Sequence, residues 1–194
     1  MWYAVIFCAV LLLDQITKIL VAAFSGAAGA GGAPVHEFWI IDDFIEIAYC
    51  ENKSGAMGLF AKLPYSQEIF LVVTVLILGG IISYLLLSRK KRGKWLNVTL
   101  SLVLSGAVGN FIDRIFTVYV RDFIHVILPF GKDGDFFPYI FNVADMALVI
   151  GAIMLVVYLL FIDKDALFKK SARKTGISET NVEKAGDSEG NADA

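Results

Sequence analysis

The chain has 194 residues, of which 57% are hydrophobic and 19% are charged, and its mean hydropathy is +0.68. A soluble domain carries roughly 45–50% apolar and about 25% charged residues, so this composition excludes a mainly soluble protein. The two cysteines lack the spacing of a metal or redox motif, and we expect free thiols. The sequence contains no glycine-rich phosphate loop and no H-E-x-x-H motif. We therefore expect no metal, no cofactor and no nucleic-acid partner.

Four apolar stretches are long enough to cross a bilayer, which takes about 20 residues. We therefore predict an all-α membrane protein with four transmembrane helices. Basic clusters at 89–94 and 169–174 mark cytoplasmic segments, and four spans then place both termini in the cytoplasm. The four stretches are Trp2–Phe24, Ile69–Leu87, Trp95–Tyr119 and Phe141–Ile162.

The segments between the spans carry their own signals. Loops at about 25–66 and 120–140 are expected on the extracytoplasmic side. Within the first loop, residues 38–49 mix apolar and acidic residues around Asp42-Asp43, a pattern typical of two strands joined by a turn. We predict a small extracytoplasmic β-rich element there. Residues 1–162 then form the membrane domain, and the polar stretch 163–194 is predicted to be a disordered cytoplasmic tail.

Two aspartates, Asp122 and Asp145, lie at the edges of very apolar segments on the same, extracytoplasmic, side. An ionisable group in such a place indicates a functional site. Two adjacent carboxylates do not both ionise easily, so they share a proton. The ionised carboxylate can activate a water while the protonated one polarises a carbonyl group. Either residue alone is equally well explained as a helix cap or a solvated boundary charge.

Further polar residues interrupt the first and third spans. Asp14 and Lys18 are four residues apart and share a helix face. They form either a structural ion pair or a support for the site. Asn110 and Arg114 also share a face, and their side chains could bind an anionic or carbonyl group. Asp113 is expected to point elsewhere and to pair locally.

Three other positions belong to short motifs of small or polar residues. The run Ser105–Gly109, with Gly106 at its centre, predicts close packing of helices. Asn142 lies three residues before Asp145 and shares its face. Asn52 precedes the second span and offers both a donor and an acceptor, although its spacing alone indicates only a turn.

Taken in order, these motifs resemble those of the lipoprotein signal peptidase family, also called signal peptidase II, over about residues 5–162. Asp14 to Lys18 is similar to that family's D-Q-x-x-K, and the run ending at Arg114 is similar to its G-N-x-x-D-R. Asp122-Phe123 and the F-N-x-A-D of residues 141–145 match its two aspartate motifs. The segment 52–58 departs from the family's N-x-G-A-A-F-G at Ser54, Gly55 and Met57, whereas Asn52 still matches.

The resemblance implies an aspartic endopeptidase of the bacterial cytoplasmic membrane. Such an enzyme removes the signal peptide of a diacylglyceryl-modified prolipoprotein by cleaving before the lipidated cysteine. It implies Asp122 and Asp145 as the catalytic pair, no metal, membrane lipid as surroundings and inhibition by the cyclic peptide globomycin. We expect a monomer, because one chain supplies both carboxylates. The residues expected to bind substrate or support the site are Asn52, Asn110, Arg114, Asn142, Asp14, Lys18 and Gly106.

Two alternatives from other classes stay open. One is a non-enzymatic assembly or anchoring protein, which would not require both aspartates. A small proton-coupled membrane carrier could use intramembrane carboxylates as a relay. Such a carrier would be expected to show repeat symmetry or broken spans around a midplane site.

Overall fold

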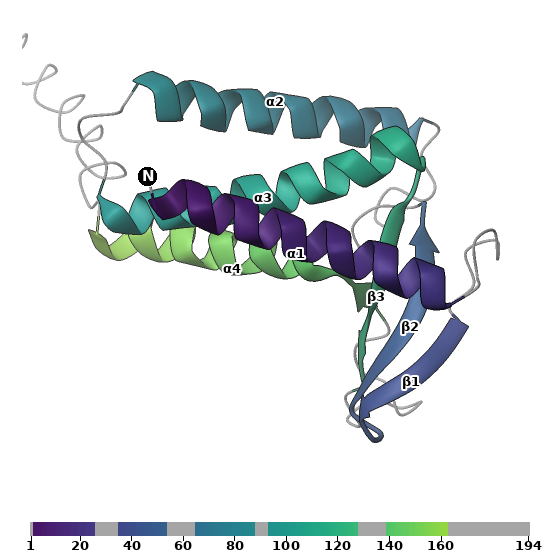
Figure 1. Cartoon of the computed structure of the whole chain (residues 1–194). Coiled ribbons are helices and arrows are strands. Elements are labelled where there is room, and N and C mark those ends of the chain that lie inside the picture. The colour runs from purple at the N-terminus through teal and green to yellow at the C-terminus, as the bar shows by residue number, and fades with distance from the viewer. Residues whose placement is uncertain (1, 26–34, 54–64, 88–92, 128–138, 163–194) are drawn as a thin grey trace, which may run out of the picture. The chain divides into compact units, whose positions relative to one another are not determined.

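The computed structural model describes residues 2–25, 35–53, 65–87, 93–127 and 139–162 (Figure 1). The chain divides into two compact units, with the boundary between Ala152 and Ile153. Long helices dominate the described residues, and a small antiparallel sheet accompanies them. In chain order the elements are α1 (Trp2–Phe24), β1 (Val35–Ile41), β2 (Ile45–Asn52), α2 (Ser66–Leu87), α3 (Lys94–Phe116), β3 (Val120–Val126), β4 (Ile140–Phe141), α4 (Val143–Val157) and the π-helical turn η2 (Tyr158–Ile162).

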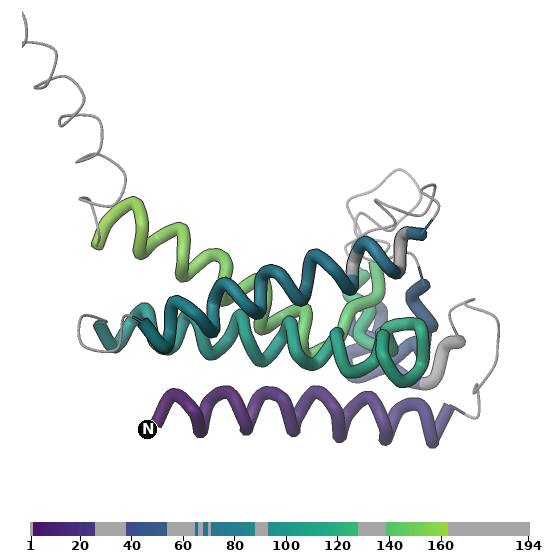
Figure 2. Tube along the Cα trace, turned by 90° about the horizontal axis from the view of Figure 1, so that it is seen from above, coloured from purple at the N-terminus to yellow at the C-terminus, as the bar shows by residue number. Residues whose placement is uncertain are grey.

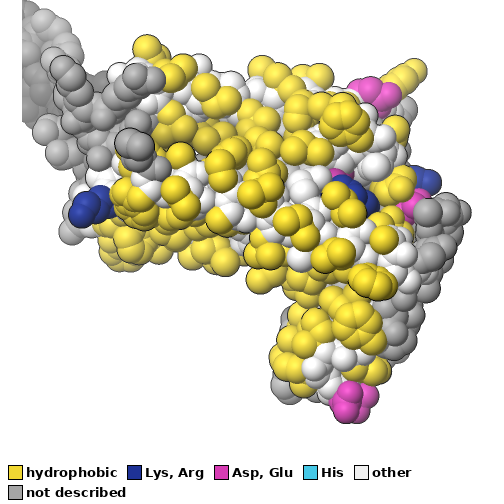
Figure 3. Space-filling model, viewed as in Figure 1, with side chains coloured by type: hydrophobic (Ala, Val, Ile, Leu, Met, Phe, Trp, Pro, Cys, Tyr) yellow, Lys and Arg dark blue, Asp and Glu magenta, His cyan; other side chains and the backbone are white. Residues whose placement is uncertain are grey.

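Three of the described helices are long and apolar enough to cross a membrane: α1, α3 and the continuous helix Val143–Ile162 formed by α4 and η2. This agrees with three of the four predicted spans. The fourth predicted span, Ile69–Leu87, is helical within α2, and among its described residues the apolar helix Leu71–Leu87 is too short to count as a span by itself. Hydrophobic side chains cover much of the helical surface seen in Figure 3.

Helix α3 is the most enclosed of the three long helices, because it packs against α1, α2 and the first turns of α4. Figure 2 shows α1 and α3 running side by side. Small residues allow this packing. A Cβ atom added at Gly106 would clash with the carbonyl oxygen of Ala144, and one at Gly109 would come within 2.6 Å of an Asp14 carboxylate oxygen. The predicted close packing at Gly106 is confirmed.

The sheet has the strand order β1-β2-β3-β4, and neighbouring strands are antiparallel. The predicted turn at Asp42-Asp43 is confirmed. The Phe44 amide donates to the Ile41 carbonyl oxygen at 3.0 Å, and Asp43 has the positive φ of 56° that a tight turn uses. The β-rich element extends beyond this hairpin, since β3 and β4 come from the segments on either side of residues 128–138.

The end of α3 places β3 next to the helices. Thr117 caps α3, with its amide donating to the Asp113 carbonyl oxygen at 2.8 Å, and Val118 then takes a φ of 65°. This reversal sends the chain into β3, which contacts both α1 and α3. The start of β3, which carries Asp122, therefore lies back beside α3.

Candidate functional site

Asp122 and Asp145 lie on two different elements that meet at the end of α3. Asp122 is the third residue of β3, opposite Cys50 of β2, and only 2% of it is exposed. Asp145 lies in the first turn of α4 and is half-buried. The structure thus brings together two carboxylates that are 23 positions apart in the sequence, as their joint linkage to Asn142 shows.

Asn142 is the residue that connects the two carboxylates. Its side-chain amide donates to Asp122 Oδ1 at 2.6 Å, and its backbone amide donates to Asp145 Oδ2 at 3.1 Å. Its Oδ1 atom accepts from the Asp145 backbone amide at 2.9 Å, which caps α4. Asn142 is fully buried, so these bonds are shielded from water.

Two further asparagines complete the bonding of the carboxylates. Asn52, at the end of β2, donates through Nδ2 to Asp122 Oδ2 at 2.9 Å. Asn110 of α3 donates through Nδ2 to Asp145 Oδ1 at 2.7 Å, and its Oδ1 atom accepts from Asn142 Nδ2 at 3.1 Å. The three asparagines predicted from the sequence therefore all contact the aspartate pair or one another.

The surroundings of Asp122 favour its protonated form. Burial raises the pKa of Asp122 to about 8, and the neighbouring Asp145 carboxylate contributes to the rise. Hydrogen bonds from Asn52 and Asn142 oppose the rise, because they stabilise the ionised carboxylate. A carboxyl group that keeps its proton near neutral pH beside a second carboxylate is suited to general acid–base chemistry.

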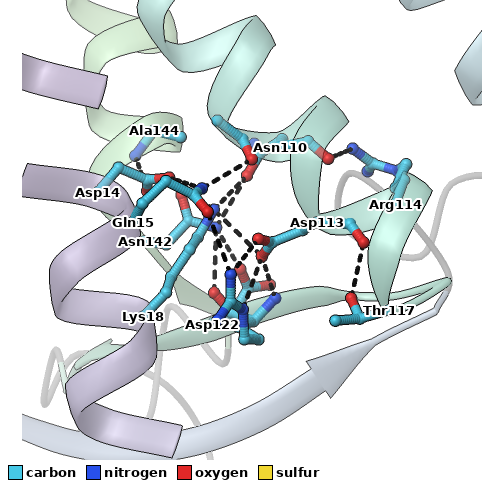
Figure 4. A network of polar contacts seen from close by, with 12 residues as sticks. Asp14, Gln15, Lys18, Asn110, Asp113, Arg114, Thr117, Asp122, Asn142 and Ala144 are labelled. Carbon is cyan, nitrogen blue, oxygen red and sulfur yellow. Dashed lines mark hydrogen bonds and ion pairs between the residues drawn. The ribbon is translucent and has the colours of Figure 1, made fainter. Parts of the chain in front are cut away.

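Lys18 lies next to this pair, at the centre of a buried charged cluster (Figure 4). Its ammonium group contacts Asp14 Oδ2 at 2.9 Å and Asp113 Oδ2 at 3.3 Å, and donates to Asn110 Oδ1 at 3.0 Å. Lys18, Asp14 and Asp113 are each 0% exposed. Because the Lys18 ammonium donates to the Asn110 oxygen, it orients the amide nitrogen of Asn110 toward Asp145.

The partners of Asp113 correct one expectation. The sequence pattern predicted a local pair, but Asp113 bonds to Lys18 of α1 and to Arg121 of β3. The Arg121 Nη2 atom lies 2.6 Å from Asp113 Oδ1 and 3.3 Å from Gln15 Oε1. Arg121 and Gln15 were absent from the predicted site. The signal for Arg121 was a charged residue directly before Asp122 within an apolar strand.

The remaining predicted residues also lie near the pair. Arg114 is half-buried and donates through Nη1 to the Asn110 carbonyl oxygen at 3.2 Å (Figure 4). Gly106 acts through packing against α4. Ser54, Gly55 and Met57, where the sequence departs from the family motif, lie outside the described residues. Within the described ranges, no group of three or more His, Cys, Asp or Glu side chains is placed to hold a metal ion.

Comparisons with known proteins agree with the motif pattern. The family model for signal peptidase (SPase) II matches residues 6–161. The lipoprotein signal peptidase of Caldanaerobacter subterraneus subsp. tengcongensis is 34% identical over 157 residues, 81% of this chain and 94% of the relative. That of Clostridium novyi is 37% identical over 152 residues, 77% of this chain and 91% of the relative. A bacterial membrane enzyme solved by the in meso method at 1.9 Å resolution superposes with a TM-score of 0.65 at 31% identity, covering 82% and 93% of the two chains.

Proposed function

We propose an aspartic mechanism for this chain, which belongs to the signal peptidase II family and is a membrane enzyme that processes prolipoproteins. In this proposal Asp122 and Asp145 hydrolyse the peptide bond before the diacylglyceryl-modified cysteine. The observation that carries the proposal is the joint bonding of both carboxylates to Asn142, with Asp122 buried and its pKa raised.

The reaction follows from one shared proton. The ionised carboxylate takes a proton from a water, whose oxygen attacks the scissile carbonyl carbon. The protonated carboxyl group donates to the carbonyl oxygen as charge develops there. When the C–N bond breaks, the carboxyl group that took the water proton passes it to the leaving nitrogen. A hydroxyl of the tetrahedral intermediate returns its proton to the other carboxylate as the C=O bond re-forms, so the pair is again singly protonated. The apparent pKa values belong to the pair as a unit, so the acid and base labels are not assigned to single residues.

The asparagines supply fixed dipoles around the two carboxylates. Asn52 and Asn142 hold both oxygens of Asp122, and Asn110 holds one oxygen of Asp145. Preorganised donors of this kind need no rearrangement during the reaction. Arg114 is proposed to bind the substrate backbone near Asn110. The site is supported by three residues that do not contact the two carboxylates directly: Asp14, Lys18 and Gly106.

The arrangement in the membrane extends the proposal. We take α2 as the fourth span, which places both termini in the cytoplasm and the aspartate pair at the extracytoplasmic face. Residues 163–194 then form a cytoplasmic tail beyond the membrane domain 1–162. The substrate's signal helix enters from the bilayer, because a lipidated protein is met there. We also propose a monomer that is inhibited by globomycin or a similar cyclic peptide. Cysteine-accessibility labelling at the two termini of the chain in right-side-out vesicles tests this orientation, because external reagent should reach neither terminus.

The activity is tested with purified protein and a synthetic diacylglyceryl prolipopeptide. Wild type should cleave before the modified cysteine, and Asp122→Asn and Asp145→Asn should each lose nearly all cleavage while remaining folded, with the wild-type helix content by circular dichroism. Full cleavage by either variant would refute the pair. Cleavage should also persist after exhaustive chelation. The carrier alternative is not supported by the family comparison, since the matching relatives are signal peptidases.

A further inference from the structure

The residue before each aspartate of the pair is held by another, fully buried aspartate. The backbone amide of Ala144, which precedes Asp145, donates to Asp14 Oδ1 at 2.9 Å. The backbone amide of Arg121, which precedes Asp122, donates to Asp113 Oδ2 at 2.9 Å. Asp14 and Asp113 take no part in the proposed chemistry. They fix the backbone from which each reacting side chain extends.

Lys18 joins these two anchoring carboxylates. Its ammonium group contacts Asp14 at 2.9 Å and Asp113 at 3.3 Å. The three side chains form a continuous buried series from α1 to α3, with the backbone before Asp145 at one end and the backbone before Asp122 at the other. The separation of the two reacting carboxylates therefore depends on this series.

The side chain of Arg121 contacts Asp113, the member of this series nearest to the backbone of Asp122. Its Nη2 and Nε atoms contact the two oxygens of Asp113 at 2.6 and 3.3 Å, a fork that only a guanidinium group can form. Nη2 also reaches Gln15 Oε1 at 3.3 Å, while the Gln15 amide nitrogen donates to Asp14 Oδ2 at 3.0 Å. The Arg121 side chain is only 14% exposed. The fork therefore holds the start of β3 against both α1 and α3.

The carbonyl oxygen of Arg121 adds a second link to the pair. It accepts from Asn142 Nδ2 at 3.4 Å, and the same nitrogen donates to Asp122 Oδ1. A shift of the Arg121 backbone would therefore move Asp122 and also disturb Asn142, one of the two asparagines that donate to it. Since Asp113 keeps Lys18 as a partner when Arg121 is replaced, the buried Asp113 carboxylate still has a cation beside it.

We propose that Arg121 is a positioning residue for the reaction. Its guanidinium contacts with Asp113 and Gln15 determine the position of Asp122 relative to Asp145. This inference rests on the proposed function. Arg121 acts through the backbone of the neighbouring residue and does not contact substrate. Its replacement should lower kcat and leave KM unchanged, because a displacement of about 1 Å at a reacting group can slow a reaction on the order of 10²-fold.

The test compares Arg121→Gln and Arg121→Lys with wild type, using the synthetic diacylglyceryl prolipopeptide. Arg121→Gln should lower kcat by about 30- to 100-fold with KM within about two-fold of wild type. Arg121→Lys keeps the charge but loses the fork, so kcat should recover to within about ten-fold of wild type. The thermal midpoint of each variant is measured in the same detergent.

His125→Gln is the matched control. It removes another side-chain contact of this sheet, in which His125 Nδ1 lies 2.6 Å from Glu46 Oε1 and the two side chains are similarly enclosed, 15% and 12% exposed. His125 lies on the same strand, β3, three residues beyond Asp122. Its variant should keep kcat within about two-fold of wild type, because the pair does not anchor the backbone before either aspartate.

Three results would overturn the inference. One is a wild-type kcat in Arg121→Gln, and another is a loss in His125→Gln as large as that in Arg121→Gln. The third is a rise in KM at unchanged kcat, which would make Arg121 a substrate contact. If Arg121→Gln fails to fold, the kcat of Arg121→Lys decides, and a value equal to wild type would refute the fork. If the wild type is inactive, the proposed function itself is refuted. If the wild type and Arg121→Gln are equally active, only the inference on Arg121 is refuted.

Discussion

Replacing Asn142 by leucine should move the alkaline limit of the reaction to higher pH. The side-chain amide of Asn142 donates to Asp122 Oδ1 at 2.6 Å, and this bond favours the ionised carboxylate. Without the bond the ionised form is less stable, so the pKa of Asp122 rises further above its present value of about 8. Leucine has a similar volume and keeps the backbone amide that donates to Asp145.

The size of the shift follows from the energy of the bond. A hydrogen bond to a charged group contributes about 1.5–3 kcal/mol. At about 1.36 kcal/mol per pKa unit, the loss corresponds to roughly one to two units. Since the proposed active state is singly protonated, the alkaline limb of the kcat profile, where the pair loses its last proton, should move up by about that amount. The maximal kcat should fall about ten-fold or more, because Asp122 also loses its orientation.

The assay is the pH dependence of kcat for cleavage of the lipopeptide between pH 5 and about 10, the range set by the expected shift. Asn97→Leu is the matched control, because Asn97 of α3 is also a buried asparagine, 8% exposed, and its Oδ1 atom has no hydrogen-bond partner among the residues that the structure describes. That variant should keep the wild-type profile. An alkaline limb in Asn142→Leu that stays in place, or moves to lower pH, would refute the role of this amide.

Three further predictions concern stability. Lys18→Met should destabilise the fold by about 3–5 kcal/mol, because it leaves two buried carboxylates without their shared cation, and an unchanged thermal midpoint would contradict this. Gly106→Ala should destabilise by about 1–3 kcal/mol, since the new methyl group meets the Ala144 carbonyl oxygen, whereas Gly79→Ala, with nothing within 4 Å, should not. Asp122→Asn should raise the thermal midpoint more at pH 8 than at pH 5. Folded Asp122 holds its proton up to about pH 8 and the unfolded residue only to about 3.9, so wild-type stability falls as pH rises through this window. An equal rise at both pH values would exclude this linkage.

The sequence predicted the features that depend on helical spacing or on a local turn. Asn142 and Asp145 share a face because they are three residues apart, and their reciprocal capping bonds confirm this. Asp14 and Lys18, four apart, form the expected pair. The hairpin at Asp42-Asp43 also follows from its local pattern. In each case the information lies within a few residues.

The contact between Asp113 and Arg121 could not be predicted in this way. Helical periodicity describes neighbours only as far as the helix continues, and α3 ends at Phe116. The turn through Thr117 and Val118, with its positive φ of 65°, reverses the chain and brings Arg121 back to Asp113. The sequence gives no signal for the angle of this reversal. The motif pattern could therefore select Asp122 but could not show what holds it.

The distribution of charge among these groups explains why the pair can retain a proton. Lys18 and Arg121 form their ion pairs with Asp14 and Asp113, whereas Asn52, Asn110 and Asn142 donate to Asp122 and Asp145 through neutral amides. An ammonium or guanidinium group bonded directly to Asp122 would hold its carboxylate ionised and lower its pKa. Neutral amides orient the oxygens and leave burial and the neighbouring carboxylate to raise the pKa of Asp122. The cations therefore fix the positions of the two aspartates through the backbone, while the amides fix their orientation without removing the proton that the reaction needs.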